Sequence, residues 1–250
     1  MNLKANTIFI TGGGSGIGQA LAIELHKLGN QVIISGRRQH ALDQTTASNP
    51  GMRSILLDIE DPASIQQAAA KLIADFPKLN VLFNNAGIMR LDNLTTSIDE
   101  SVLTSTINTN LFGPIRMTAA LIDHLKQQPA AAVINVSSGL AFIPLAPTAV
   151  YCATKAALHS YTQSLRYQLK DTTVKVLELI PPYVATDLLN GASDPRAMPL
   201  SDFIAETMSL LATDANEITV DRVKPQRNAA GPNEATFFQQ FNDAMAQNPH

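Results

Sequence analysis

The chain has 250 residues, a formal net charge of −3 and 45% hydrophobic residues. This length fits one large α/β domain or two small ones, and it allows a substantial core. The weak acidic balance and the lack of a basic run argue against nucleic acid or an anionic membrane as a partner, and no apolar stretch reaches the roughly 18 residues of a membrane span. A single cysteine, Cys152, suits the reducing cytoplasm and predicts a small buried side chain. The five histidines lack the spacing of zinc ligands, so no metal site is predicted.

The first organised stretch is a β-rich run followed by a glycine-rich turn. Residues 7–11 read TIFIT, and apolar residues then recur at helical spacing up to about Leu28. A strand, a glycine turn and a helix N-terminus together form a cradle for a phosphate, because the glycines let the backbone approach and unpaired N–H groups face the anion. A glycine loop without a ligand is the disfavoured alternative. The residues predicted to hold the anion are Gly12, Gly14, Ser15, Gly16, Ile17 and Gly18.

The end of the second predicted strand indicates which dinucleotide would bind. Residues 31–35 (QVIIS) form this strand, and Gly36 stands where an acidic residue would bind the ribose 2′-hydroxyl. Arg37 and Arg38 follow, and a guanidinium makes charge-assisted bonds to a 2′-phosphate. The sequence therefore favours NADP(H) over NAD(H). The alternative is that both arginines are solvated, more so Arg38 than Arg37.

Strands and helices alternate along the rest of the chain without a linker or repeat. This alternation predicts a single Rossmann-type domain, a doubly wound parallel sheet of six or seven strands with helices on both faces. The later strands are expected at residues 53–57, 80–83, 131–136 and 174–180, and the helices at 61–75, 99–127 and 151–169. A seventh strand near residues 218–220 is doubtful.

The C-terminal part, residues 187–250, is less regular. Pro, Gly and Asp residues punctuate 190–199, which we expect to be a flap at the substrate entrance. Helices are predicted over 200–211 and 236–245. The sequence assigns no chemistry to this tail.

Ser138, Tyr151 and Lys155 form a proton-transfer set. If Tyr151 enters a helix, Lys155 lies one turn along the same face. An ammonium beside the phenol is expected to lower the tyrosine pKa from about 10 by roughly 1–3 units, toward the range of a general acid or base. The Ser138 hydroxyl can hold a substrate carbonyl beside it.

With these residues together, the chain resembles the short-chain dehydrogenase/reductase family from Thr7 to Leu188. The stretch Thr11-Gly12-x-x-x-Gly16-x-Gly18 is similar to the family's cofactor loop, and Tyr151-x-x-x-Lys155 is similar to its catalytic motif. The resemblance implies that Asn110 completes a catalytic set with Ser138, Tyr151 and Lys155. It further implies that the cofactor also contacts Asp58, Ile59, Asn85, Ala86, Gly87, Tyr151, Lys155, Pro181, Val184 and Thr186. Pro182 departs from the family's usual glycine and reduces the freedom of the backbone that leads to the expected contact of Thr186.

The function that this pattern predicts is NADP(H)-dependent hydride transfer between nicotinamide and a carbonyl or secondary alcohol, with Tyr151 as general acid or base. A redox sensor without catalysis is the alternative, which the presence of both Tyr151 and Lys155 disfavours. Arg90 could meet an anionic substrate, although a solvated arginine is favoured. The resemblance implies a homodimer or homotetramer built on the two long helices. Several apolar residues fall on segments expected around the cleft, and they suggest an apolar or aromatic carbonyl substrate. The equally favoured alternative is that they pack in the core. These residues are Leu140, Phe142, Ile143, Leu145, Tyr183, Leu188 and Leu189.

Overall fold

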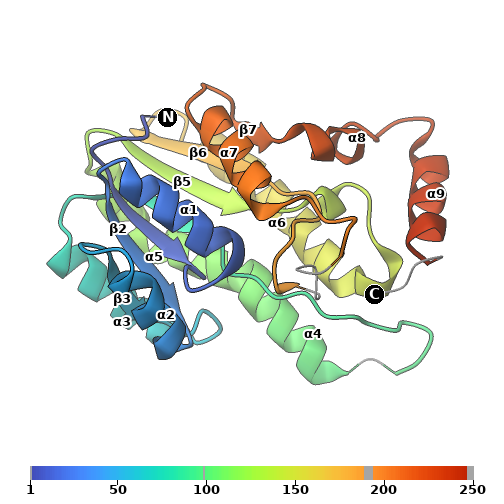
Figure 1. Cartoon of the computed structure of the whole chain (residues 1–250), viewed down its shortest axis with the longest axis horizontal. Helices are drawn as coiled ribbons and strands as arrows, with labels where there is room; N and C mark the ends of the chain where they lie inside the picture. The colour runs from blue at the N-terminus through green and yellow to red at the C-terminus, as the bar shows by residue number, and fades with distance from the viewer. Residues whose placement is uncertain (1, 98, 189–193, 247–250) are drawn as a thin grey trace.

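A computed structural model describes residues 2–97, 99–188 and 194–246 of the chain. Its centre is a parallel sheet of seven strands in the order β3-β2-β1-β4-β5-β6-β7 (Figure 1). The predicted doubly wound sheet is therefore confirmed. The strands are β1 (Thr7–Thr11), β2 (Gln31–Gly36), β3 (Arg53–Leu56), β4 (Leu79–Asn84), β5 (Ala131–Val136), β6 (Val174–Ile180) and β7 (Glu217–Thr219).

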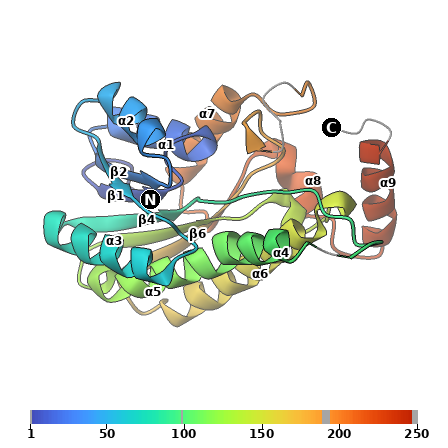
Figure 2. The ribbon, with the colours of Figure 1, turned by 90° about the horizontal axis from the view of Figure 1, so that it is seen from below.

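Helices cover both faces of the sheet. Figure 2 shows α1, α2 and α7 on one face and α3, α4, α5 and α6 on the other, while α9 stands at the far end of the molecule. The helices are α1 (Gly16–Lys27), α2 (Gln39–Ala47), α3 (Pro62–Asp75), α4 (Glu100–Ile107), α5 (Gly113–Lys126), α6 (Ala149–Gln168), α7 (Leu200–Leu211), α8 (Lys224–Arg227) and α9 (Glu234–Ala246).

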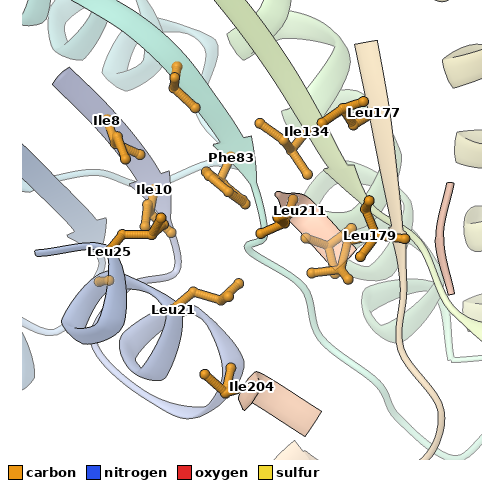
Figure 3. Packing of buried hydrophobic residues seen from close by; sticks show 14 of the residues in the cluster. Ile8, Ile10, Leu21, Leu25, Phe83, Ile134, Leu177, Leu179, Ile204 and Leu211 are labelled. Atoms are coloured by element: carbon orange, nitrogen blue, oxygen red, sulfur yellow. The ribbon is translucent and has the colours of Figure 1, made fainter. Parts of the chain in front are cut away.

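The central strands are mostly apolar because both of their faces are covered. All six residues of β5 are buried. On one face, side chains such as Ile10, Phe83 and Ile134 pack against Leu21 of α1 and Ile204 of α7 (Figure 3). Burial of this kind stabilises a core by about 25 cal/mol per Å² of apolar surface removed from water. The two apolar faces thus fix the positions of the strand ends.

The strand order reverses at the boundary between β1 and β4. Ile10 of β1 lies in register with Ile34 of β2 on one side and with Phe83 of β4 on the other. The chain leaves these neighbouring strands toward opposite faces, so a crevice opens beyond their carboxyl ends. The glycine-rich loop and the residues after β4 meet in this crevice.

The structure differs from the sequence expectations at three places. Helix α2 was not predicted, since its polar sequence has only Leu42 and Thr45 buried. The stretch predicted as one long helix contains a π-helical segment, Asn108–Phe112, between α4 and α5. The seventh strand, doubted from the sequence, does form: Ile218 pairs with Leu179 of β6 and is fully buried.

The expected flap at residues 190–199 is described only from Asp194 onward, since residues 189–193 lie outside the described part of the chain. Its final residues are attached to the segment after β6, where the backbone N–H of Ala185 donates to the carbonyl of Met198 at 2.8 Å. Within the described ranges, none of the helices combines the length and the apolar character needed to cross a membrane.

Candidate active site

A cavity of about 720 Å³ lies beyond the carboxyl ends of the strands. Loops after β1, β2, β4, β5 and β6, together with α6, contribute to its walls. Most of the residues predicted from the sequence line it: Gly12, Gly14, Ser15, Gly16, Ile17, Gly18, Arg37, Arg38, Ile59, Asn85, Ala86, Gly87, Ser138, Tyr151, Lys155, Pro181, Val184 and Thr186. The fold therefore brings most of the predicted cofactor and catalytic residues to one cavity, with Asp58 and Asn110 as the exceptions.

The glycine-rich loop has the shape of a phosphate cradle. Gly12 and Gly16 have φ angles of +69° and +55°, in the region that favours glycine. A Cβ at Gly18 would lie 2.3 Å from the Asn85 side-chain nitrogen and 2.4 Å from the Gly12 carbonyl oxygen. Asn85 Nδ2 also donates to the Thr11 carbonyl at 2.9 Å, which attaches the loop to the end of β4. These residues fit a dinucleotide pyrophosphate, which would meet the N-terminus of α1.

The two predicted arginines stand at the β2 end of the cavity in different surroundings. Arg38 Nη2 donates to Ser15 Oγ of the glycine-rich loop at 3.3 Å. Arg37 Nη1 forms a partly exposed ion pair with Glu60 Oε1 at 3.1 Å. Asp58, expected to contact the cofactor, is exposed and does not line the cavity; its carboxylate instead accepts a bond from the Glu60 N–H at 3.0 Å. Its neighbour Ile59 lines the cavity in its place.

Helix α6 places Tyr151 and Lys155 one turn apart on the wall of the cavity. Both side chains are almost fully buried, at 6% and 4% exposure. Lys155 Nζ donates to the carbonyl of Val136 at 2.8 Å and lies 5.6 Å from the centre of the Tyr151 ring. Ser138, at the end of β5, forms a hydrogen bond with the Tyr151 phenol. The predicted serine, tyrosine and lysine are thus adjacent.

The pKa values of Tyr151 and Lys155 are shifted by burial, and the tyrosine shift is opposite to the sequence expectation. Burial raises the pKa of Tyr151 to about 12, and the hydrogen bond from Ser138 opposes this only in part. Burial also lowers the pKa of Lys155 to about 8, while the negative charge of Glu178 raises it. The prediction that Lys155 brings the tyrosine pKa down was therefore wrong for this structure. Desolvation disfavours both charged forms, and it is the largest cause of both pKa shifts.

Asn110 lies directly behind the cavity wall. Its side chain makes two bonds to the backbone of Ile88: Oδ1 accepts from the N–H at 2.9 Å, and Nδ2 donates to the carbonyl at 2.8 Å. A Cβ at Gly87 would lie 3.4 Å from Asn110 Oδ1 and 3.6 Å from Lys155 Nζ. The π-helical segment thus places Asn110 close to the lysine but outside the cavity lining.

The apolar residues suggested for substrate binding divide into two groups. Leu140, Leu145, Tyr183 and Leu188 line the cavity. Phe142 and Ile143 do not line it: the Phe142 ring packs edge-on against His159, and Ile143 is fully buried. Leu189 lies outside the described residues, and Arg90 is exposed and outside the cavity lining.

The sequence analysis missed one wall of the cavity, which comes from α9. Phe237, Phe241 and Met245 recur at intervals of four residues and line the cavity. Asn242 attaches the helix to the loop before α6, accepting a bond from the Ala146 N–H at 2.6 Å and donating to the Pro144 carbonyl at 3.0 Å. The spacing of four residues was the sequence signal that could have revealed this wall.

The fold and this site define an oxidoreductase of the Rossmann type, and the comparisons agree. The chain belongs to the short chain dehydrogenase family, whose model matches residues 6–197. The uncharacterized oxidoreductase DltE of Bacillus subtilis is 38% identical over 97% of this chain and 98% of its own length.

Solved structures show the same fold. A short chain dehydrogenase from Burkholderia cenocepacia in complex with NADP has a TM-score of 0.83 at 23% identity, covering 96% of this chain and 98% of that chain. A short chain dehydrogenase/reductase from Burkholderia phymatum in complex with NAD has a TM-score of 0.81 at 21% identity, covering 100% and 97%. Relatives of this fold therefore bind either dinucleotide.

Proposed function

We propose that the chain is an NADP(H)-dependent reductase of apolar carbonyl compounds, acting in reverse on secondary alcohols. The observation that carries this proposal is the convergence of Ser138, Tyr151 and Lys155 on the cavity that also contains the glycine-rich loop. A proton donor, a carbonyl-binding hydroxyl and a phosphate cradle in one cavity are the parts that such a reaction needs.

The residues that would hold the dinucleotide extend along the cavity. The glycine-rich loop would bind the pyrophosphate of the dinucleotide, and Asn85, Ala86 and Gly87 would border the middle of the dinucleotide. Arg38, bonded to Ser15, and Arg37 would bind the 2′-phosphate, with Glu60 partly neutralising Arg37. When bound, the dinucleotide supplies or accepts the hydride.

The side chains of Ser138, Tyr151 and Lys155 would orient the substrate carbonyl and supply the proton that its oxygen takes up. In the reductive direction, the Ser138 hydroxyl donates a hydrogen bond to the carbonyl oxygen, and the Tyr151 phenol donates its proton to the same oxygen. The raised pKa of Tyr151, about 12, keeps the phenol protonated and ready to donate at neutral pH. The Lys155 ammonium then stabilises the phenolate that remains, since opposite charges interact strongly in a buried site.

The substrate class follows from the remaining walls of the cavity. Leu140, Leu145, Phe241 and Met245 belong to one apolar cluster with Tyr151. A carbonyl carbon placed at the Tyr151 phenol would have its substituents among these apolar side chains. We infer a ketone or aldehyde that carries an aromatic or aliphatic group.

The experiment is the consumption of NADPH and NADH by the full chain over a panel of aliphatic and aromatic ketones and aldehydes. We expect faster turnover with NADPH, with the highest rates on the apolar carbonyls. Preference for NADH would overturn the cofactor assignment. NADPH binding without turnover on any carbonyl would favour the sensor function instead.

A matched pair of variants on α9 tests the substrate class. Phe241→Ala removes a ring from the cavity, whereas Phe238→Ala alters the same helix at a ring that is 39% exposed and does not line the cavity. We expect Phe241→Ala to raise KM for a bulky aryl ketone about tenfold, and KM for acetone little, because apolar contact is lost only by the larger substrate. Equal effects of the two variants would contradict this role of α9.

A further inference from the structure

Glu178 is a fully buried carboxylate beside the catalytic residues. It belongs to β6 and is 0% exposed. Ser137 Oγ donates to its Oε1 at 2.5 Å, and its Oε2 lies 2.8 Å from His159 Nδ1. Ser137 immediately precedes Ser138, and His159 follows Lys155 by one turn of α6. The carboxylate therefore contacts the residue that precedes Ser138 and the residue one helical turn after Lys155, and Ser138 and Lys155 are both proposed catalytic residues.

Lys155 and Glu178 share a property that no other charged side chain in the described ranges has: both are buried. A charge away from water is costly unless a charge of opposite sign lies near it. The charge of Glu178 favours the ammonium form of Lys155 and raises its pKa against the effect of burial. The two buried charges therefore compensate each other across the interface between α6 and β6.

Lys155 and Glu178 both contact the end of β5, the segment that leads to Ser138. Lys155 Nζ donates to the carbonyl of Val136, one residue before Ser137. Glu178 is in register with Asn135, one residue before Val136. The end of β5, which carries Ser138, is thus held by Lys155 on one side and by Glu178 through Ser137 on the other.

We propose that Glu178 is a positioning residue for the catalytic set: its buried charge holds Lys155 as an ammonium, and its bond to Ser137 fixes the end of β5 that presents Ser138. His159 completes the arrangement as the second hydrogen-bond partner of the carboxylate. The catalytic purpose rests on the proposed function, while the electrostatic coupling between Glu178 and Lys155 does not.

The other charged groups around Glu178 are mostly paired. Arg227 of α8 binds Glu217 of β7 through two nitrogens, at 2.7 and 3.0 Å. Arg166 of α6 binds the Val176 carbonyl at 2.8 Å. Ligand atoms of His159, Glu178 and Glu217 lie within 4.8 Å of one another, but the arginine on Glu217 already supplies positive charge there, so we assign no cation to them.

The test is an NMR titration of Lys155 in the full chain, with lysine labelled by ¹³C and ¹⁵N and the Lys155 signal assigned by its loss in Lys155→Met. Glu178→Gln keeps the side-chain shape and removes the charge. We expect it to lower the titration midpoint of Lys155 by about one pH unit. Ser137→Ala removes the hydrogen bond and keeps the charge, so it should leave the midpoint where it is. An unchanged midpoint in a folded Glu178→Gln variant would overturn the proposal.

Two further measurements complete the design. If Glu178→Gln fails to fold, Glu178→Asp replaces it, because this variant keeps the negative charge. A Lys155 titration midpoint near that of the wild type supports the proposal, and a midpoint about one pH unit lower contradicts it. With NADPH and the best carbonyl of the panel, Glu178→Gln should shift the alkaline limb of kcat to lower pH. Ser137→Ala should lower kcat without that shift; a shift in both would contradict the assigned division of roles. Because the NMR titration needs no turnover, its outcome is independent of whether the proposed reaction is correct.

Discussion

At the scale of single residues, the site is governed by desolvation. Lys155 and Tyr151 are both buried, and burial moves their pKa values in opposite directions, to about 8 and about 12. A phenol that stays protonated suits the reductive direction, in which it must give up a proton. The depressed lysine pKa means that the ammonium needed to stabilise the phenolate is maintained at a cost in folding stability.

This cost predicts a pH-dependent effect of Lys155→Met on stability. The folded-state pKa of about 8 lies below the ordinary value of 10.5, so the unfolded chain binds more protons between these pH values and stability rises with pH there. Loss of Lys155 also leaves Glu178 without its buried counter-charge at both pH values, so the titration of Lys155 determines only the pH-dependent part of the effect. The stability of the variant relative to wild type should therefore be about 2 kcal/mol more favourable at pH 7 than at about pH 10. Urea unfolding at both pH values measures this, with exposed Lys71→Met as the control. An effect that is equal at both pH values would contradict the burial argument.

The arginines give a second prediction at this scale. Arg38→Ala should lower kcat/KM with NADPH about tenfold, because it removes a charge-assisted bond to the 2′-phosphate. The value with NADH should change little. Steady-state kinetics with both cofactors measures the ratio, and Arg53→Ala, in the exposed first position of β3, is the control. Equal losses with both cofactors would mean that Arg38 only supports the loop through Ser15.

At the scale of elements, the start of α6 determines where Tyr151 lies. Asp92, in the loop after β4, accepts bonds from the N–H groups of Ala149 and Val150 at 3.0 and 2.9 Å. It therefore caps the catalytic helix from a distant part of the chain. The loop after β4 and the helix that carries Tyr151 are joined at this point.

Asp92→Ala should therefore impair both stability and catalysis. We expect a loss of about 1 kcal/mol, typical of a removed N-cap, together with a lower kcat because Tyr151 is less well placed. The control is Asp99, which caps α4 by accepting bonds from the N–H groups of Ser101 and Val102. Asp99→Ala should destabilise the fold to a similar degree and leave kcat nearly unchanged. Thermal unfolding and kinetics on both variants test the difference. Parallel losses of kcat would show that the effect of Asp92 is only on stability.

Much of this arrangement could be predicted from the sequence because local patterns determine it. Glycine spacing, apolar runs and the interval from Tyr151 to Lys155 predicted the sheet and the residues of the cavity. The Asp92 cap and the Glu178 network join segments far apart in sequence, so no local pattern reports them. For α9, the four-residue spacing indicates an apolar face but does not show which part of the chain that face covers. The Tyr151 pKa was mispredicted for a related reason: burial depends on everything that surrounds the ring, and chain spacing shows only one neighbour.

At the scale of the whole molecule, the two long helical elements leave aromatic side chains on the surface. Tyr167 of α6 is 70% exposed, and Phe112, beside α5, is 42% exposed. We propose that a second copy of the chain covers these helices, as a homodimer or as half of a homotetramer. Light scattering after size-exclusion chromatography should then give twice or four times the chain mass. Tyr167→Glu should lower that mass, and a monomeric wild type would contradict the proposal.

The most direct test of the proposed function is the comparison of wild type and Tyr151→Phe in two measurements. NADPH binding, followed by cofactor fluorescence, should be nearly unchanged, because the phenyl ring keeps the shape of the site. NADPH consumption with the best carbonyl of the panel should fall by about 10²–10⁴-fold, since the proton donor is lost. A variant that binds NADPH and turns over at nearly the wild-type rate would show that Tyr151 is not the acid, and the proposed mechanism would be wrong.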